Sequence, residues 1–300
     1  MCRVCYSVLC SLTVALVLFA VGCNGTGSEP SDEGLFATGG GTAAGKSTAT
    51  PVDDSQGFAT ITGTVTFDGD PPVMAEMPGM RQHADAKECL KGTQSERDEQ
   101  TWMVDSGTKA VRNVVVWVTP PKGQYFKKPA DDKKTWKDEV TVDQPHCAFI
   151  PHVVVLFPQY FDGEKRAATG QKMTVLNSAK VAHNIRVGGS SQFNPSSGGT
   201  VSPGLRYEFT RIRVDKQEVS MNCDIHKWMN GFAMTFDHPY AAVTDAEGKF
   251  KIENVPAGSE LTFMGWHEAL KKFTPEVSGG TKIKLEKDKP VDLSFKIRAK

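Results

Sequence analysis

Two stretches of alternating apolar and polar residues enclose a short run of chemically unusual side chains. Large apolar residues recur at every second position in 217–223 and again in 231–236. A period of two is typical of β-strands that each bury one face. The pattern therefore predicts two neighbouring strands, with a tight turn at residues 223–229 joining them.

A second pair of predicted strands lies upstream, at 172–177 and 181–187. In the later strand, His183 shares a face with the aliphatic residues Ile185 and Val187. An imidazole that points into an apolar core needs partners for its ring nitrogens, and a metal ion is one such partner. His183 is therefore a candidate metal ligand.

The turn between the first two strands carries a thiol, an imidazole and a thioether at regular spacing. Two residues separate Cys223 from His226, and two more separate His226 from Met229. Together with His183 they would supply two imidazoles, a thiolate and a weak thioether, which suits copper in electron transfer. Zinc sites usually add cysteines or histidines instead. A metal-free core is the alternative interpretation, and Met234 is a rival thioether whose place inside a strand favours a core role.

The spacing Cys-x-x-His-x-x-Met, after an upstream His-Asn pair, resembles the type I copper site of cupredoxins, the family of amicyanin and plastocyanin. The resemblance covers about residues 141–237 and implies a Greek-key β-sandwich. It implies His183, Cys223, His226 and Met229 as copper ligands. Asn184 would connect the two ligand loops.

The same resemblance implies that electrons enter and leave through an exposed edge of His226. Trp228 beside it would form an apolar docking patch for a redox partner protein. Lys227 stands where related loops often have proline, and its charge favours an acidic partner. Alternatively, Trp228 only caps the end of the sandwich.

Strand and turn patterns also flank this segment on both sides. Residues 59–67 alternate before an Asp-Gly-x-Pro turn at 68–71, and 111–118 is β-rich. Residues 244–250 and 255–258 read Thr-Asp-x-x-Gly-x-Phe and Val-Pro-x-Gly. These motifs resemble those of the carboxypeptidase regulatory-like domain, a transthyretin-type, immunoglobulin-like β-sandwich.

The chain is therefore predicted to be all-β, with one sandwich inserted into another. We expect a discontinuous outer sandwich, 58–140 with 238–300, because neither half alone has enough strands to close a core. The inserted cupredoxin-like domain would be 141–237. Two or three sandwiches in series are the alternative.

The N-terminus has the pattern of an export signal. An apolar run at 6–21 leads into Ala20-Val21-Gly22-Cys23, which resembles a bacterial lipoprotein signal over residues 1–22. Cys23 would then carry the lipid, and the Gly- and Ser-rich residues 23–57 would form a flexible tether. We expect an exported, membrane-anchored lipoprotein that faces the periplasm or the cell surface. An ordinary cleaved signal or an uncleaved anchor is the alternative.

Three cysteines remain after the signal and the lipidation site, namely Cys89, Cys147 and Cys223. If Cys223 binds copper, Cys89 and Cys147 are free to form a disulfide in an oxidising compartment. A Cys147–Cys223 bridge is the competing arrangement and would abolish the copper site. His146 and His152, which flank Cys147, are expected to have a structural role.

Charge and motifs narrow the function. Lys and Arg together number 35, as do Asp and Glu together, so the formal net charge is zero and does not favour nucleic-acid binding. No phosphate-binding loop, serine elbow or paired-carboxylate motif suggests hydrolysis. The sequence therefore favours a copper electron carrier that is not an enzyme. The alternatives are a cell-surface module that binds carbohydrate or an envelope protein, and a copper storage or delivery protein.

Overall fold

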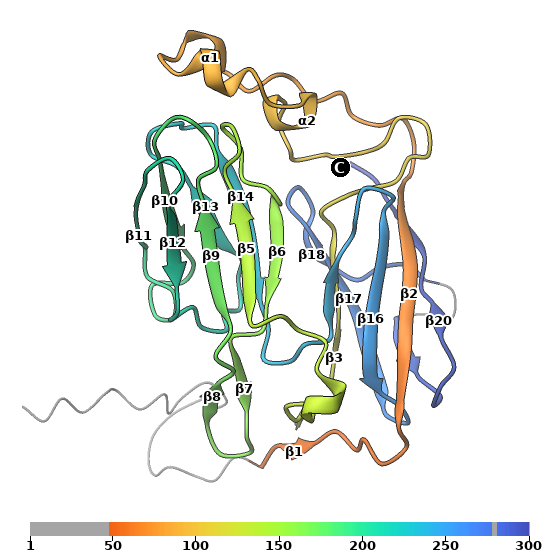
Figure 1. Cartoon of the computed structure of the whole chain (residues 1–300). Coiled ribbons are helices and arrows are strands. Elements are labelled where there is room, and N and C mark those ends of the chain that lie inside the picture. Colours follow the sequence, from red (N-terminus) through yellow and green to blue (C-terminus); the bar gives the residue numbers. More distant parts are fainter. Residues whose placement is uncertain (1–47, 278–280, 300) are drawn as a thin grey trace, which may run out of the picture. The chain divides into compact units, whose positions relative to one another are not determined.

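The computed structural model describes residues 48–277 and 281–299. This part of the chain is mostly β-strand, with a few short helices (Figure 1). No helix within it is long and apolar enough to cross a membrane. The predicted signal peptide, Cys23 and most of the predicted tether lie outside the described residues.

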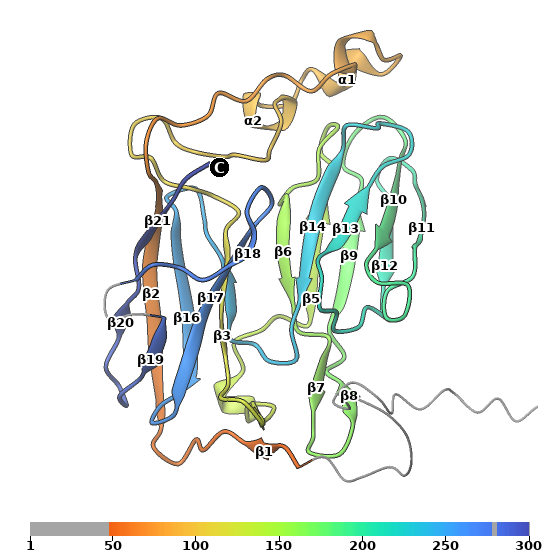
Figure 2. The same ribbon diagram turned by 180° about the vertical axis from the view of Figure 1, so that it is seen from behind.

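Eight strands form a two-sheet sandwich, here called the inner sandwich. Its five-stranded sheet has the order β11-β10-β13-β14-β6, which Figure 2 shows from behind. Its three-stranded sheet has the order β12-β9-β5. The strands are β5 (Glu139–Asp143), β6 (Val153–Leu156), β9 (Lys172–Leu176), β10 (His183–Gly188), β11 (Ser197–Val201), β12 (Arg206–Phe209), β13 (Val219–Asn222) and β14 (Asn230–Thr235).

One buried apolar cluster fills the space between these two sheets. It includes Met173 and Val175 from β9 together with Ile185 from β10 and Met221 from β13. Ile185 and Met221 alternate with more exposed residues along β10 and β13, as expected where one face of a sheet is buried. In β9, Thr174 between Met173 and Val175 is buried as well. The cluster also contains Cys223, so the candidate site adjoins this core.

The expected pairing between 172–177 and 181–187 is wrong. β9 pairs with β12 and β5, whereas β10 pairs with β11 and β13. The connection between them passes from one sheet to the other, and Asn177 Nδ2 donates hydrogen bonds to the carbonyls of Val181 and Val201. Both strands direct apolar residues into the same core. The sequence pattern alone therefore does not show whether they pair within one sheet or lie in opposite sheets.

Nine further strands form the outer sandwich, so called because its segments flank the inner sandwich in sequence. One sheet has the order β15-β3-β17-β18, with β19 also paired to β17, and the other has β16-β2-β20, with β21 also paired to β2. The strands are β2 (Phe58–Phe67), β3 (Val115–Thr119), β15 (Ala241–Val243), β16 (Lys249–Pro256), β17 (Glu260–His267), β18 (Lys271–Phe273), β19 (Lys282–Lys284), β20 (Val291–Asp292) and β21 (Phe295–Ile297).

Strands from both ends of the described chain share these two sheets. β2 lies between β16 and β20 (Figure 1). β3 lies between β15 and β17. Every second residue of β2 is buried, including Ile61 and Val65, which pack with Phe263 of β17 in one apolar cluster. The domain boundaries and the transthyretin-type identity of this sandwich remain predictions.

The segment between β2 and β3 contains three short helices, η1 (Met80–Gln82), α1 (Ala86–Cys89) and α2 (Gln94–Arg97). The sequence predicts that residues 58–140 belong to the outer sandwich. However, Met77, Met80 and Cys89 belong to the apolar cluster of the inner sandwich. This segment therefore belongs to the outer sandwich by sequence but packs on the inner one.

Residues 48–57, which the sequence assigns to the flexible tether, take part in the fold. β1 (Thr50–Pro51) pairs in parallel with β4 (Gln124–Tyr125), and Val52 is buried in the outer core. Burial of Val52 is the physical reason that residues 48–57 are held. The remaining elements are a hairpin of β7 (Gln159–Phe161) and β8 (Arg166–Ala168), and the exposed helix η2 (Asp131–Lys133).

Candidate metal centre

The turn that carries Cys223, His226 and Met229 is folded by its own hydrogen bonds. β13 and β14 pair antiparallel up to Asn222 opposite Asn230, so residues 223–229 must reverse the chain. The amide of Cys223 donates to the carbonyl of Met229 (3.3 Å), and the amide of Met229 donates to the carbonyl of His226 (2.9 Å). The amide of His226 lies 3.4 Å from Cys223 Sγ. The sulfur and the imidazole are thus held close together.

His183 reaches the same place from the neighbouring strand. Arg186 of β10 pairs with Asn222 of β13, and the strands are antiparallel, so the start of β10 runs beside the turn. His183 Nδ1 lies 3.0 Å from His226 Nδ1, and Cys223 Sγ lies 3.9 Å from His226 Nδ1. The three candidate ligand atoms all lie within 4.8 Å of one another.

Burial keeps both imidazoles neutral. Burial, reinforced by the charge of His226, lowers the pKa of His183 to about 4. Burial also lowers the pKa of His226, although the hydrogen bond to the Asp85 carboxylate opposes this shift. A neutral imidazole has an unprotonated nitrogen, which is what a metal ion binds.

The donor set fits a soft metal ion. Two nitrogens 3.0 Å apart can both lie at the usual metal–imidazole distance of about 2 Å from one ion. Cys223 is buried, and within the described ranges it is the cysteine that has no disulfide. Thiolate and imidazole together suit copper.

Met229 and Met234 occupy different clusters. Met229 is buried in the inner core with Cys223. Met234 packs in a separate cluster with Trp117 and Trp266 of the outer sandwich. Of the two thioethers considered from sequence, Met229 is therefore the one that shares the surroundings of Cys223.

Asn184 connects the two loops that carry the candidate ligands. Its Oδ1 accepts the amide of Asp224 (2.6 Å) and the thiol of Cys223 (3.3 Å). Its Nδ2 donates to Asp224 Oδ2 at 2.9 Å. Asp224 also pairs with Arg186 on β10. The position of Cys223 is thus fixed from β10 as well as from its own turn.

Comparisons with known proteins add little to this geometry. No protein-family model matches the sequence, and no curated protein is found to be similar. A reduced-state amicyanin mutant is similar over 40% of this chain and 99% of its own, with 16% identity and a TM-score of 0.25. A purple cupredoxin from Nitrosopumilus maritimus is similar over 32% of this chain and 99% of its own, with 14% identity and a TM-score of 0.24. Likeness at this level does not establish a fold or a family.

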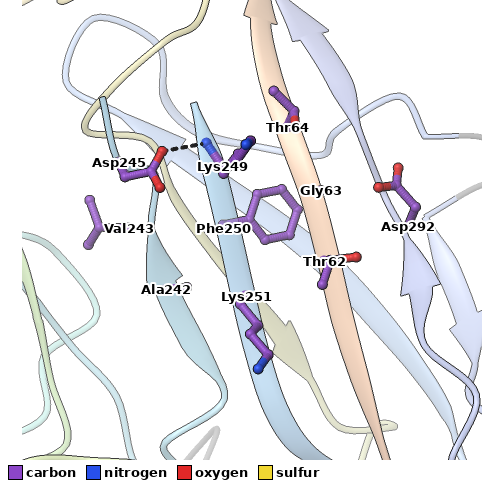
Figure 3. A pocket seen from close by; sticks show the side chains of 10 residues that line it. All are labelled: Thr62, Gly63, Thr64, Ala242, Val243, Asp245, Lys249, Phe250, Lys251 and Asp292. Carbon is purple, nitrogen blue, oxygen red and sulfur yellow. Dashed lines mark hydrogen bonds between the residues drawn. The ribbon is translucent and has the colours of Figure 1, made fainter. Parts of the chain in front are cut away.

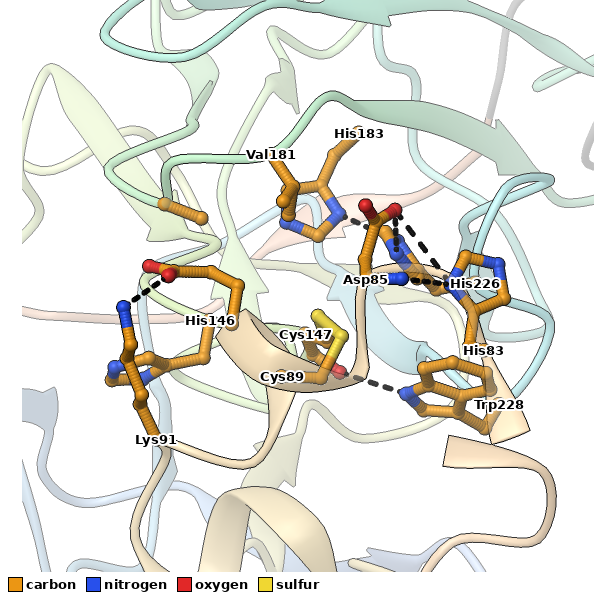
Figure 4. The surroundings of a disulfide bond; sticks show 12 residues. His83, Asp85, Cys89, Lys91, His146, Cys147, Val181, His183, His226 and Trp228 are labelled. Atoms are coloured by element: carbon orange, nitrogen blue, oxygen red, sulfur yellow. Dashed lines mark hydrogen bonds and ion pairs between the residues drawn. A yellow bond between two sulfur atoms is a disulfide. The ribbon is translucent and has the colours of Figure 1, made fainter. Parts of the chain in front are cut away.

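Two residues that the sequence analysis missed, His83 and Asp85, lie against His226. Asp85 Oδ2 is 3.1 Å from His226 Nε2, and the His83 and His226 ring centroids are 4.7 Å apart. Figure 4 shows both beside His226 and Trp228, next to the Cys89–Cys147 disulfide. His226 is 0% exposed, so the expectation of an exposed His226 edge is wrong. The predicted Cys89–Cys147 disulfide was the one sequence feature that could have indicated this contact, because it brings the residues near 89 to the inner sandwich.

The disulfide joins Cys89 to Cys147, and the competing Cys147–Cys223 bridge is absent from the described structure. Trp228 Nε1 donates to the carbonyl of Cys147 (3.2 Å), so this ring packs over the disulfide segment. Lys227 is exposed and lies 3.7 Å from Asp224. Of the two residues considered for docking, Lys227 is the more accessible.

His146 and His152 lie outside the cluster of candidate ligands. His146 Nδ1 lies 2.8 Å from Glu96 Oε1. His152 is buried, with its two nitrogens 3.1 Å from the carbonyl of Asn230 and 2.8 Å from Glu268 Oε2. Each histidine has a protein partner, as expected of a structural role.

A shallow pocket on the outer sandwich is another candidate binding site. Figure 3 shows it across β2 and β16, with the Phe250 ring against Gly63. Phe250 is the one aromatic residue among the ten that line the pocket, and it is buried. The pocket therefore offers no exposed ring on which a sugar could stack. Its lining is Thr62, Gly63, Thr64, Ala242, Val243, Asp245, Lys249, Phe250, Lys251 and Asp292.

Proposed function

We propose that this protein is an exported, membrane-tethered blue-copper electron carrier, and not an enzyme. Its ligands would be His183, Cys223, His226 and Met229. The observation that carries the proposal is the convergence of two neutral imidazoles and one free thiol, all buried, within 4.8 Å. A metal-free core has no need to bring these three groups together.

Each side chain has a role that its surroundings support. The Cys223 thiolate would be the strongest donor, the two imidazoles would bind beside it, and the Met229 thioether would be the weakest donor. Copper bound there would change between Cu(II) and Cu(I) and so carry one electron. The hydrogen bonds of the turn and of Asn184 hold the donors in place before metal binds. Little rearrangement would then accompany electron transfer.

Export and tethering are part of the proposal. A disulfide between Cys89 and Cys147 is typical of an oxidising compartment, which supports export by the signal predicted at 1–22. Lipid on Cys23 would attach the protein to the membrane. The redox partner would be a protein with an acidic surface, since Lys227 is exposed at the tip of the turn.

Copper retention tests this function. Purified protein is equilibrated with Cu(II), dialysed, and analysed for metal. We expect one copper per chain, with loss of retention in Cys223→Ser and His183→Ala. Met229→Leu should keep copper and raise the reduction potential, because it removes only the weak axial donor. Copper that exchanges rapidly without reversible redox cycling would support storage or delivery instead, and no retained copper would refute the copper site.

A further inference from the structure

Asp85 occupies a position where its side chain would ordinarily serve the helix. It is the N-cap of α1, and an aspartate there usually accepts hydrogen bonds from amides of the first turn. The Asp85 carboxylate makes no such bond. Instead, Oδ2 lies 3.1 Å from Nε2 of the buried His226. The carboxylate is thus directed at a candidate copper ligand.

The two nitrogens of His226 face different partners. Nδ1 faces the other candidate ligands, 3.0 Å from His183 Nδ1 and 3.9 Å from Cys223 Sγ. Nε2 faces Asp85. A carboxylate accepts but does not donate when ionised, so His226 must carry its proton on Nε2. Nδ1 is then unprotonated, with its lone pair directed at the other candidate ligands.

We propose that Asp85 is a positioning residue that fixes the tautomer and orientation of His226 for copper binding. The inference rests on the proposed function, because it concerns the same metal site. A hydrogen bond from the far ring nitrogen to a carboxylate orients a metal-binding histidine and makes it a better donor. Asp85 provides that bond from a segment that does not belong to either ligand loop.

A disulfide bond and a buried apolar side chain hold the segment around Asp85 in this position. Cys89, at the end of α1, is bonded to Cys147 of the inner sandwich. The amides of Glu88 and Cys89 donate to the carbonyl of Asp85, at 2.9 and 3.1 Å, which places Asp85 relative to the disulfide. Met80 is fully buried just upstream. The segment therefore cannot move away from His226 without exposing Met80 or straining the disulfide link.

This arrangement also closes the outer edge of His226. Asp85, His83 and the ring of Trp228 surround it, with ring centroids 4.7 Å and 5.3 Å from that of His226. His226 is fully buried, whereas the Asp85 side chain is 33% exposed, so solvent cannot reach Nε2 although it reaches the carboxylate. The segment thus contributes both the acceptor and shielding of Nε2.

Two variants and a matched control test the role of Asp85. Asp85→Ala removes the acceptor, whereas Asp85→Asn keeps a neutral one. Glu88→Gln removes a carboxylate from the same helix, where it pairs with Lys91 and not with His226. Cu(II) affinity is measured by competition with a chelator, and the reduction potential by redox titration. Unfolding in urea confirms that each variant is folded.

We expect Asp85→Ala to weaken Cu(II) binding by about 10- to 100-fold. Asp85→Asn should lose less, and both should have a raised reduction potential because the imidazole donates less to Cu(II). Glu88→Gln should match the wild-type protein in affinity and potential. Equal affinity and potential in wild type and Asp85→Ala would overturn the inference and leave the copper site intact.

A metal-free measurement separates this inference from the proposed function. Nitrogen NMR of the imidazoles in the copper-free protein reports which nitrogen of His226 carries the proton. We expect the Nε2–H tautomer in wild type and in Glu88→Gln, and a mixture of tautomers in Asp85→Ala. If the wild-type protein binds no copper, the copper function fails while this result still decides the role of Asp85. An Nδ1–H tautomer in wild type would refute that role.

Discussion

The candidate ligands meet because each lies at the end of a strand or in the turn between two strands. His183 begins β10, and Cys223 directly follows β13. His183 keeps its place on the buried face of β10 with Ile185, and the hydrogen bonds of the turn hold Cys223 and His226 beside it. This combination allows three polar groups to converge at the edge of an apolar core.

Asn184 should stabilise the copper-free protein as well as the site. Asn184→Ala leaves the Asp224 amide and the Cys223 thiol without their acceptor. Loss of one partner from part-buried hydrogen bonds costs about 1–3 kcal/mol. Urea unfolding should show this loss. Asn222→Ala is the matched control, because the Asn222 side chain donates to Ser220 Oγ in its own strand. An equal loss in both variants would contradict the role of Asn184.

At this scale the sequence identified His183, Cys223 and His226 as candidates, and the structure brings them together. Their spacing carries the information, since a two-residue interval in a tight turn holds donors close together. Asp85 and His83 were missed because they lie about 140 residues from His226 in sequence. Contacts over such a distance leave no local periodicity to detect.

At the scale of elements, α1 is a four-residue helix that has no core of its own. A helix this short is unstable in isolation. It persists because Cys89 is bonded to Cys147 and buried in the inner core. The sequence predicted the strands from alternation, but residues 77–97 have no such period, and their packing on the inner sandwich could not be predicted.

Removing the disulfide should therefore destabilise the protein. The bridge closes a loop with a sequence separation of 58, for which chain entropy alone gives a contribution of about 4 kcal/mol. In urea unfolding, we expect the Cys89→Ser/Cys147→Ser double variant to lose most of this contribution to the free energy of unfolding. Wild-type protein measured with and without reductant is the matched control. A decrease in the free energy of unfolding well below about 1 kcal/mol, the contribution of a single hydrogen bond, would contradict the structural role of the disulfide.

At the scale of the whole molecule, buried histidines link stability to pH. His238 and His267 are almost fully buried, and each accepts a backbone amide on Nδ1, from Tyr240 (3.2 Å) and Ala269 (3.3 Å) respectively. Burial lowers the pKa of both from 6.5 to about 4. Protonation would also remove the acceptor on Nδ1.

The copper-free protein should therefore lose stability as the pH falls from about 6.5 to about 4. In this window the unfolded chain binds protons that the folded chain excludes, so the free energy of unfolding decreases with acidification. Each histidine should contribute roughly 3 kcal/mol over the full range. Urea unfolding at several pH values measures the slope. A constant free energy of unfolding across this window would contradict the burial of these histidines.

The visible absorption spectrum of the copper-loaded protein tests the central claim most directly. A thiolate bound to Cu(II) gives an intense blue absorption by charge transfer from sulfur to metal, and no other described side chain near the site supplies a thiolate. We predict that the wild-type protein turns blue with one equivalent of Cu(II) and bleaches reversibly on reduction, while Cys223→Ser stays colourless. A colourless wild-type protein at full copper loading would contradict the account.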